Sequence, residues 1–277
     1  MSDRDRPFRQ VDVFPGSALG GNPVAVVLDA VGLGDDAMRS FARWTNLSET
    51  TFVLPPTAPG ADYRLRIFTP TEELPFAGHP TLGSAHAFAE HTGAAGDRLV
   101  QECGVGLVPL RRAEGGWAFA APDLRRSGPA TDEEVARIAE GLGIGAWDVL
   151  AAEWVDNGPG WVVAVLRDAD AVLELHPDLE RMRYPTGVVG AFPSGGPADF
   201  EVRAFVPGLG VDEDPVTGSL NAGIATWFFA SGRATGGYTV RQGTRVGADG
   251  LVRVTQEADG VWIAGATRTV LAGTAAL

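Results

Sequence analysis

The sequence predicts an α+β fold of two pseudo-symmetric lobes, each a barrel-like, mostly antiparallel sheet wrapped around a central helix. The first observation is an internal repeat, in which RIFTPTEELPFAGHPTLGSAHA (66–87) is echoed by RAFVPGLGVDEDPVTGSLNA (203–222), with Pro80 and Pro215 135 residues apart. Asn22 and Asn157, in a weaker echo, have the same separation. The second observation is that each copy leads into an apolar helix followed by short strands. Two copies indicate two lobes rather than a solenoid, with a cleft between them that suits a small molecule.

The N-terminal lobe is predicted to cover residues 1–122. β-Branched residues and Gly/Pro punctuation predict strands, and an apolar stripe with turn residues at its ends predicts a helix. The strands are expected at 8–14, 22–28, 49–54, 63–69, 99–109 and 117–120. A first helix is expected from Asp35 and Asp36, which can cap it, to Asn46, and a second from Pro80, in the first helical position, to Gly93.

The C-terminal lobe is predicted to cover residues 130–277, and its last strand can return to the N-terminal lobe. The segment APDLRRSGP (121–129) is expected to connect the lobes, and 132–142 to form a surface helix. The twin of the repeat helix is expected from Pro215 to Gly232, apolar nearly all round and therefore wrapped by other structure. Further strands are expected at 238–242, 251–255 and 261–264.

Composition excludes several classes of function. A net charge of −13 argues against nucleic acid as a partner, because such binding needs basic residues to neutralise phosphates. All 22 basic residues are Arg, so Schiff bases, lysine-anchored pyridoxal phosphate and the GK[ST] phosphate loop are excluded. No GxGxxG opens a βαβ unit, which argues against a dinucleotide site.

The expected compartment is the cytoplasm. A single Cys103 cannot form an intramolecular disulfide and fits a reducing environment. The first ten residues carry no apolar signal segment, and no run approaches the ~18 apolar residues of a membrane span. No secretion or membrane insertion is therefore expected.

Both copies of the repeat place polar residues at a predicted helix start. His79 precedes Pro80 in one, Asp214 precedes Pro215 in the other, and Gly-Ser follows in both. The backbone N–H groups and the positive dipole end of a helix start bind anions, so two facing starts would hold a carboxylate. The residues alone leave open that Asp214 and its neighbours are only helix caps.

Glu49 and His79 are the candidate proton-transfer groups. Glu49 stands at the mouth of a strand among apolar neighbours, where lost hydration lets a carboxyl group exchange protons near neutral pH. His79 lies at a helix start, and histidine titrates near pH 7. Residue-level reasoning leaves open a surface or capping role for Glu49 and a structural role for His79.

The other histidines and the cysteine are expected to have no catalytic role. No HExxH or Cys/His set occurs, so no metal site is expected. His86 and His91 are expected on the exposed side of the first repeat helix, and His176 in a loop. Cys103, in the strand-like ECGVGLV, is expected to be a small buried hydrophobic residue.

Four segments taken together, NLSETTF, RIFTPTEELPFAGHPTLGSA, GVDEDPVTGSLNA and RQGTRVG, resemble the PhzF family of phenazine biosynthesis isomerase-like proteins. The resemblance extends from VDVF at Val11 to the last strands. It implies a fold similar to diaminopimelate epimerase, with the active site between the lobes. It also implies an isomerase of secondary metabolism, as in antibiotic biosynthesis, that needs no cofactor and is often a homodimer.

The resemblance also implies roles for particular residues. Glu49 corresponds to the general acid/base of the family. The residues that would complete the catalytic set and contact the substrate are His79, Asp214, Gly78, Pro80, Gly218 and Ser219. Relatives often carry an Arg where this chain has Ala248, so that contact is in doubt, although Arg241 or Arg245 can compensate. Related epimerases use two opposed cysteines, a mechanism that one cysteine excludes.

The expected reaction moves a proton and a double bond within a small unsaturated, cyclic or hydroxylated carboxylic or amino acid. The carboxylate would bind at the helix starts while Glu49 removes a proton and returns it elsewhere on the conjugated system. Three alternatives stay open: dehydration or lysis, epimerisation with His79 or Asp214 as second acid/base, and a binding module without turnover.

Overall fold

The computed structural model describes residues 4–207 and 212–277, and the chain divides into two compact units. The first unit is Met1–Ala120 with Ala264–Leu277, and the second is Ala121–Ile263. The last strand, β17 (Gly260–Ala276), therefore belongs mainly to the first unit.

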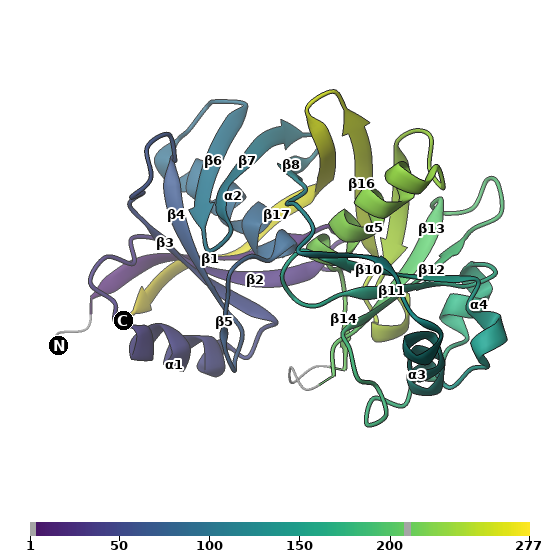
Figure 1. Ribbon diagram of the computed structural model, residues 1–277. Helices are drawn as coiled ribbons and strands as arrows, with labels where there is room; N and C mark the ends of the chain where they lie inside the picture. Colours follow the sequence, from purple (N-terminus) through teal and green to yellow (C-terminus); the bar gives the residue numbers. More distant parts are fainter. Residues whose placement is uncertain (1–3, 208–211) are drawn as a thin grey trace. The chain divides into compact units, whose positions relative to one another are not determined.

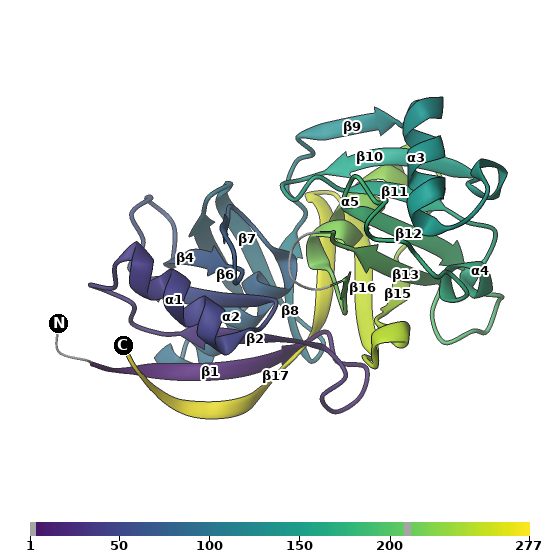
Figure 2. The same ribbon diagram turned by 90° about the horizontal axis from the view of Figure 1, so that it is seen from below.

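The strands of the first unit close into a barrel in the order β17-β1-β2-β3-β4-β6-β7-β8, with β8 pairing back to β17. The pairs β2–β3 and β4–β6 are parallel. Figure 2 shows β1 and β17 running side by side in antiparallel register. The strands are β1 (Asp5–Val13), β2 (Asn22–Val27), β3 (Glu49–Leu54), β4 (Tyr63–Phe68), β5 (Glu73–Leu74), β6 (Arg98–Cys103), β7 (Gly106–Ala113) and β8 (Gly116–Ala120).

Helix α2 (Gly78–Thr92) is the central helix of this unit and contacts β1, β2, β3, β4, β6 and β8 (Figure 1). Its small residues let the surrounding strands approach closely, since a Cβ on Gly83 would lie 2.3 Å from Cγ1 of Val24. Helix α1 (Asp35–Thr45) instead packs against β3 and β4 with one buried face. Most of α2 is thus buried, whereas α1 buries one face only.

The second unit repeats this plan with a curved sheet in the order β9-β10-β11-β12-β13-β15-β16. Its central helix α5 (Gly218–Ser231) contacts β10 and β16. The strands are β9 (Arg126–Pro129), β10 (Ala151–Asp156), β11 (Val162–Val165), β12 (Thr186–Ala191), β13 (Phe200–Phe205), β14 (Glu213–Asp214), β15 (Tyr238–Gln242) and β16 (Gly250–Glu257). The remaining helices are α3 (Asp132–Leu142), α4 (Ala169–Leu173), η1 (Ala146–Asp148) and η2 (Thr244–Val246).

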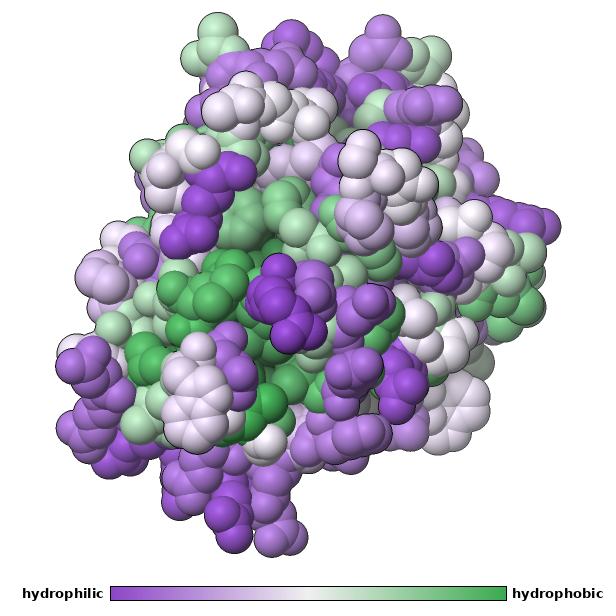
Figure 3. Space-filling view, turned by 90° about the vertical axis from the view of Figure 1, so that its right-hand side faces the viewer, coloured by the Kyte–Doolittle hydropathy of each residue, from purple (hydrophilic) through white to green (hydrophobic). Residues whose placement is uncertain are grey.

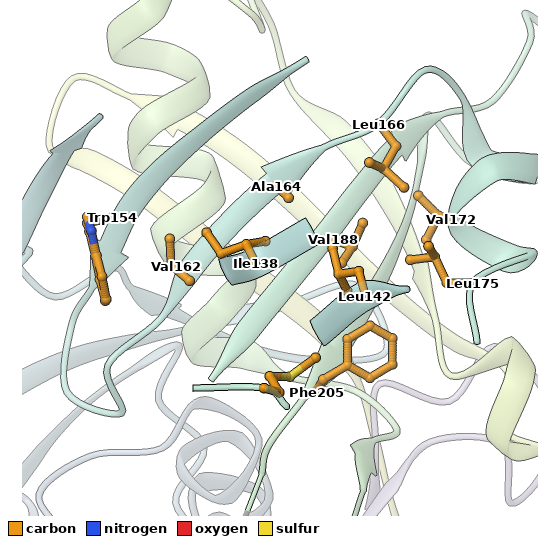
Figure 4. Packing of buried hydrophobic residues seen from close by; sticks show 11 residues of the cluster. Ile138, Leu142, Trp154, Val162, Ala164, Leu166, Val172, Leu175, Val188 and Phe205 are labelled. Carbon is orange, nitrogen blue, oxygen red and sulfur yellow. The ribbon is translucent and has the colours of Figure 1, made fainter. Parts of the chain in front are cut away.

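The hydrophobic core of the second unit includes a cluster that joins α3 and α4 to the sheet (Figure 4). Ile138 and Leu142 from α3 and Val172 from α4 pack with Val162 and Val188 from the strands between them. Hydrophobic side chains also gather around a hollow on the face shown in Figure 3. A cavity of about 440 Å³ in this unit is lined by Leu142, Ile144, Trp147, Leu150, Leu166 and Leu175, among others.

These observations confirm the predicted α+β class, with a mostly antiparallel sheet around one central helix in each unit. The helix at 132–142 is also confirmed, with Thr131 and Glu134 forming a capping box. Within the described residues, no helix combines the length and hydrophobicity needed to span a bilayer.

Several predicted boundaries were wrong for local reasons. Helix α5 begins at Gly218 with Thr217 as N-cap, three residues after Pro215, whereas α2 begins before Pro80, which is its third residue. Proline fits there because the first-turn N–H groups have no partner within the helix. Helix α1 is capped by the extended Gly34, so its two acidic residues lie in the first turn.

Two strand predictions also changed. The segment 99–109 is a hairpin, β6 and β7, whose register pairs Cys103 with Gly106. The predicted connector at 121–129 contains β9, which pairs antiparallel with β10. Its Arg/Ser/Gly composition hid the strand, because it is held at the sheet edge by backbone pairing and by polar contacts of Arg126 rather than by an apolar pattern.

Replacing Gly223 with Ala tests the close packing of α5. An added Cβ would lie 2.5 Å from the carbonyl oxygen of Val155 in β10, so the backbone must move. We expect a loss of about 1–3 kcal/mol in the free energy of unfolding, which exceeds the ~1 kcal/mol that Ala contributes in a helix. The control is Gly236→Ala, which meets nothing within 4 Å and should change stability by about 0.5 kcal/mol or less. Equal urea midpoints for the two variants would contradict this packing.

Candidate active site

Glu49 and His79 lie together in the first unit. Oε2 of Glu49 is 3.3 Å from Nε2 of His79, and their side chains are 14% and 3% exposed. The distance is slightly beyond a normal hydrogen bond, as catalytic pairs often are before substrate binds. The structure therefore joins the two predicted proton-transfer groups in one buried place.

Two neighbouring contacts explain this placement. Glu49 begins β3, and side chains two residues apart on a strand share a face, so Glu49 and Thr51 point to the same side. Thr51 Oγ1 lies 2.9 Å from Ser84 Oγ on α2, and it also donates to the carbonyl of Ala25 in β2. These bonds tie β3 to the central helix near the turn that carries His79.

His79 is a neutral imidazole at ordinary pH. Burial lowers its pKa to about 3, and this outweighs a hydrogen bond to the carbonyl of Pro23, which favours the charged form. A carbonyl only accepts, so the nitrogen that bonds Pro23 is a donor, and Nε2 facing Glu49 is the acceptor nitrogen of the ring. The contact is thus not an ion pair. It can hold one proton, either on Oε2 of Glu49 or on Nε2 of His79.

The helix start beside this pair offers backbone donors. Gly78 and Pro80 are buried with His79 in the first turn of α2. Ala77 at the N-cap provides no side-chain acceptor, and the first turn contains no acidic residue. The N–H groups of Gly78 and His79 have no intrahelical acceptor, so this turn can bind an anionic group.

In the second unit, Asp214 lies on the short strand β14, just before α5. Its neighbour Glu213 forms a two-pronged salt bridge with Arg203 of β13, with distances of 3.1 and 2.8 Å. Arg203 also donates to the carbonyls of Val172 and Leu175. Oδ2 of Asp214 accepts a 2.5 Å hydrogen bond from the hydroxyl of Thr217. The carboxylate is therefore fixed on a rigid support.

Gly218 and Ser219 are the first two residues of α5, and both are buried. Trp161 Nε1 donates to Oγ of Ser219 at 3.1 Å, and Asn157 Nδ2 donates to the carbonyl of Ser219 at 2.8 Å. Since its hydroxyl oxygen already accepts from the indole, Ser219 can donate its own proton to a ligand. The weak sequence echo at Asn157 thus marks a residue that supports this helix start.

The strand registers relate the two units residue by residue. Phe68 and Phe205 occupy matching positions, because they pair with Glu73 and Glu213 in the next short strand. Arg66 and Arg203, two residues earlier, hold these glutamates in the same two-pronged way.

This register corrects the repeat alignment predicted from the sequence. Pro215 corresponds to Pro75 rather than to Pro80, and the helix starts match as Gly78 with Gly218 and His79 with Ser219. Gly-Ser follows both Pro80 and Pro215, and matching these residues had shifted the alignment by five residues. Because Phe68 and Phe205 pair with Thr50 and Thr186, Glu49 corresponds to Pro185, so the second unit has no acid at this position.

The remaining candidates lie elsewhere. His86, predicted to be exposed, is partly buried and its ring nitrogens lie 3.0 Å from the hydroxyls of Thr267 and Thr269. Cys103 is half-buried rather than fully buried, and burial raises the pKa of its thiol. His91 and His176 are exposed. Among residues 4–207 and 212–277, no group of three or more His, Cys, Asp or Glu side chains could hold a metal ion.

Sequence reasoning did not single out Thr217, Gln242 or Trp161. Thr217 lies inside EDPVTGS and Gln242 inside RQG, two motifs that carried the family resemblance. Their hydrogen bonds depend on contacts between residues distant in sequence, which letters alone do not show.

Comparisons with known proteins agree with this picture. The family model described as phenazine biosynthesis-like protein matches residues 11–277. The chain is 39% identical to trans-2,3-dihydro-3-hydroxyanthranilate isomerase of Pseudomonas aeruginosa, over 78% of this chain and 77% of that protein. It is 35% identical to the protein named Antisense-enhancing sequence 1 of Schizosaccharomyces pombe, over 97% and 98% of the two chains.

Solved structures agree on the fold. A PhzF family phenazine biosynthesis protein from Enterococcus faecalis matches with a TM-score of 0.81 and 26% identity, over 99% of this chain and 100% of that one. A hydroxyproline epimerase from Agrobacterium vitis matches with a TM-score of 0.60 and 13% identity, over 99% and 93%. The second likeness concerns the fold alone.

Burial of His79 makes stability fall in acid. The folded state keeps the ring neutral down to about pH 3, whereas the unfolded chain binds a proton below about pH 6.5, so stability is lost as the pH falls through this window. Between pH 8 and pH 5 this group alone should cost about 2 kcal/mol of unfolding free energy.

The measurement is the urea unfolding free energy of the wild type and of His79→Gln at both pH values. The difference between them should change by about 2 kcal/mol. The control His91→Gln alters an exposed histidine and should keep the wild-type slope. Parallel pH dependence in the wild type and His79→Gln would show that the ring is not held neutral.

Proposed function

The chain belongs to the phenazine biosynthesis-like family and is an isomerase, and we propose that it moves a proton and a double bond within a small unsaturated acid, with Glu49 as general acid/base. The observation that carries this proposal is the buried contact between Oε2 of Glu49 and Nε2 of the neutral His79. No cofactor enters the proposed reaction.

The pair supports a two-step proton transfer. Glu49 removes a proton from an acidified carbon of the substrate, and His79, as a neutral acceptor, can share or relay it before it returns to another carbon. One carboxyl group suffices because it acts first as base and then as acid. A positioned general acid/base of this kind contributes about 10²–10⁴ in rate.

The helix starts supply the proposed substrate contacts. In the first unit, Gly78, with Pro80 shaping the turn, would bind the substrate carboxylate through backbone N–H groups. In the second unit, Gly218 and Ser219 would do the same, and Asp214 would orient an amino or hydroxyl group. Preorganised donors at developing negative charge contribute on the order of 10²–10³ each.

The proposed substrate is an unsaturated, cyclic or hydroxylated carboxylic or amino acid of secondary metabolism. Support comes from relatives named trans-2,3-dihydro-3-hydroxyanthranilate isomerase, which makes this compound the first to assay. Ala248 stands where the resemblance expects an Arg, so a substrate with a different peripheral group is equally compatible with the site.

We also propose that the protein is a cytoplasmic homodimer that acts in secondary metabolism, as in antibiotic biosynthesis. The family resemblance supports the dimer, and the single half-buried cysteine fits a reducing compartment. Light scattering on the purified protein tests the dimer directly.

Epimerisation is the second candidate, because Asp214 provides a further carboxyl group held by its own hydrogen bonds. Analysis of the product distinguishes isomerisation from epimerisation, from dehydration and from binding without turnover. Loss of water lowers the product mass, epimerisation keeps the double bonds in place, and a binding module gives no product.

Glu49→Gln tests the proposed acid/base role. The amide keeps the shape of the side chain but cannot exchange the proton, so kcat should fall by about 10²–10⁴. In D₂O the wild type should place deuterium on the product carbon, and the variant should not. The control is Glu133→Gln, which changes an exposed carboxyl group on α3 and should leave the rate unchanged. Undiminished deuterium incorporation by Glu49→Gln would refute the role.

A further inference from the structure

The side chain of Gln242 is fully buried beside the start of α5 and makes four hydrogen bonds. Its Oε1 accepts from the backbone N–H of Thr217 at 3.1 Å and from Nδ2 of Asn221 at 2.9 Å. Its Nε2 donates to the carbonyl of Asp214 at 3.1 Å and to Oγ1 of Thr217 at 2.9 Å. A single amide thus bonds to Asp214 at the end of β14 and to Thr217 at the N-cap of α5.

The chemistry of these partners fixes which way the amide faces. A backbone N–H can only donate, so the atom opposite Thr217 N must be oxygen. A backbone carbonyl can only accept, so the atom opposite the Asp214 carbonyl must be the NH₂ group. Two backbone groups therefore determine the orientation independently, and a flipped amide would place like groups against each other on both sides.

The fixed amide sets the direction of the next hydrogen bond. Because Nε2 of Gln242 donates to Oγ1 of Thr217, the hydroxyl proton of Thr217 points elsewhere. Oδ2 of Asp214 lies 2.5 Å away and is the acceptor of that proton. A short bond from a neutral donor is typical of a charged acceptor. Hydrogen bonding to the charged form of a carboxyl group favours that form.

The first unit shows that the fold does not require this chain of bonds. By the strand registers, Leu74 corresponds to Asp214 and Cys103 corresponds to Gln242. Ala77 occupies the N-cap position that Thr217 holds in the second unit. The same strand–turn–helix arrangement thus forms in the first unit with apolar residues at these three positions. The fold alone therefore does not explain why the second unit has the Gln242–Thr217–Asp214 hydrogen bonds.

We propose that Gln242 is a positioning residue that acts through Thr217 to keep Oδ2 of Asp214 an ionised acceptor, so that Asp214 orients the substrate by accepting a hydrogen bond from an N–H or O–H group. The substrate group at this position must then be a donor, such as an amine or a hydroxyl, and not an ether or a carboxylate. This inference rests on the proposed function, because it deepens the role of Asp214 in that site.

Other charged groups of the neighbouring strands do not provide the same effect. Arg203 and Glu213 neutralise each other in their two-pronged bridge. Arg241 on β15 pairs with Asp249 at 3.1 Å. Burial raises the pKa of Glu201 on β13 to about 7, so this group titrates near neutral pH and has to be separated from Asp214 in any titration.

The test titrates Asp214 by ¹³C NMR of its carboxyl carbon, assigned with Asp214→Asn, in a Glu201→Gln background. Thr217→Val removes the donating hydroxyl, and Gln242→Leu removes the donor to Oγ1 without adding a charge. In both variants the midpoint of Asp214 should move about one pH unit upward. Thr217→Ser restores the hydroxyl and should return the wild-type midpoint.

Asn221→Ala is the control for a structural role. It removes bonds to Gln242 and to the Thr217 carbonyl but leaves the hydroxyl directed at Asp214. It should lower the melting temperature without moving the Asp214 titration. Unchanged midpoints in Thr217→Val and Gln242→Leu, or an equal shift in Asn221→Ala, would overturn the proposal.

Kinetics provide the second arm. Thr217→Val should lower kcat/KM by about 10- to 100-fold and move the acid limb of the pH profile upward, and Thr217→Ser should recover most of the loss. The titration needs no turnover, so it still reads the state of Asp214 if the wild type has no isomerase activity. A shifted titration with an inactive wild type would reject the proposed function alone.

Discussion

The buried contact between Glu49 and His79 is the constraint on which the rest of the site depends. Desolvation keeps His79 neutral, and its bond to Pro23 leaves Nε2 as an acceptor toward the carboxyl group. A protonated His79 would form a fixed ion pair with Glu49, and Nε2 could then no longer accept a proton. In the proposed reaction, a neutral ring instead leaves a single proton that can move between substrate, carboxyl group and ring. The ring is only 3% exposed, and this burial is the cause of its lowered pKa.

The two units share one architecture but carry different polar residues at matching positions. At matching positions, Glu49 corresponds to Pro185, and His79 to Ser219, while Asp214 corresponds to Leu74. What the duplication retains is structural: the central helix, the two-pronged Arg–Glu bridge and the glycine at the helix start. Within the described residues, the Glu49–His79 pair belongs to the first unit and the Gln242–Thr217–Asp214 chain to the second. This asymmetry fits a reaction in which one carboxyl group carries the proton and another orients the substrate.

The fold was largely predictable from the sequence. β-Branched runs, Gly/Pro punctuation and the apolar repeat helices predicted the central helices, most strands of the first unit, and β15, β16 and part of β17, because periodicity reports directly on burial. The strands β10, β11, β12 and β13 of the second unit were not predicted. The edge strand β9 was missed since backbone pairing, not an apolar pattern, holds it. The helix starts were misplaced because Pro80 sits inside the first turn while Pro215 precedes it. The site residues were named from motifs, but the neutral state of His79 and the role of Gln242 depend on burial and on long-range contacts.

The most direct test of the account is ¹⁵N NMR of the His79 ring, assigned by its absence in His79→Gln. The account predicts a neutral ring at pH 7 and still at pH 5, with Nδ1 protonated and Nε2 unprotonated toward Glu49. A ring carrying protons on both nitrogens at pH 7 would contradict it, because Glu49 would then face a fixed cation instead of an acceptor.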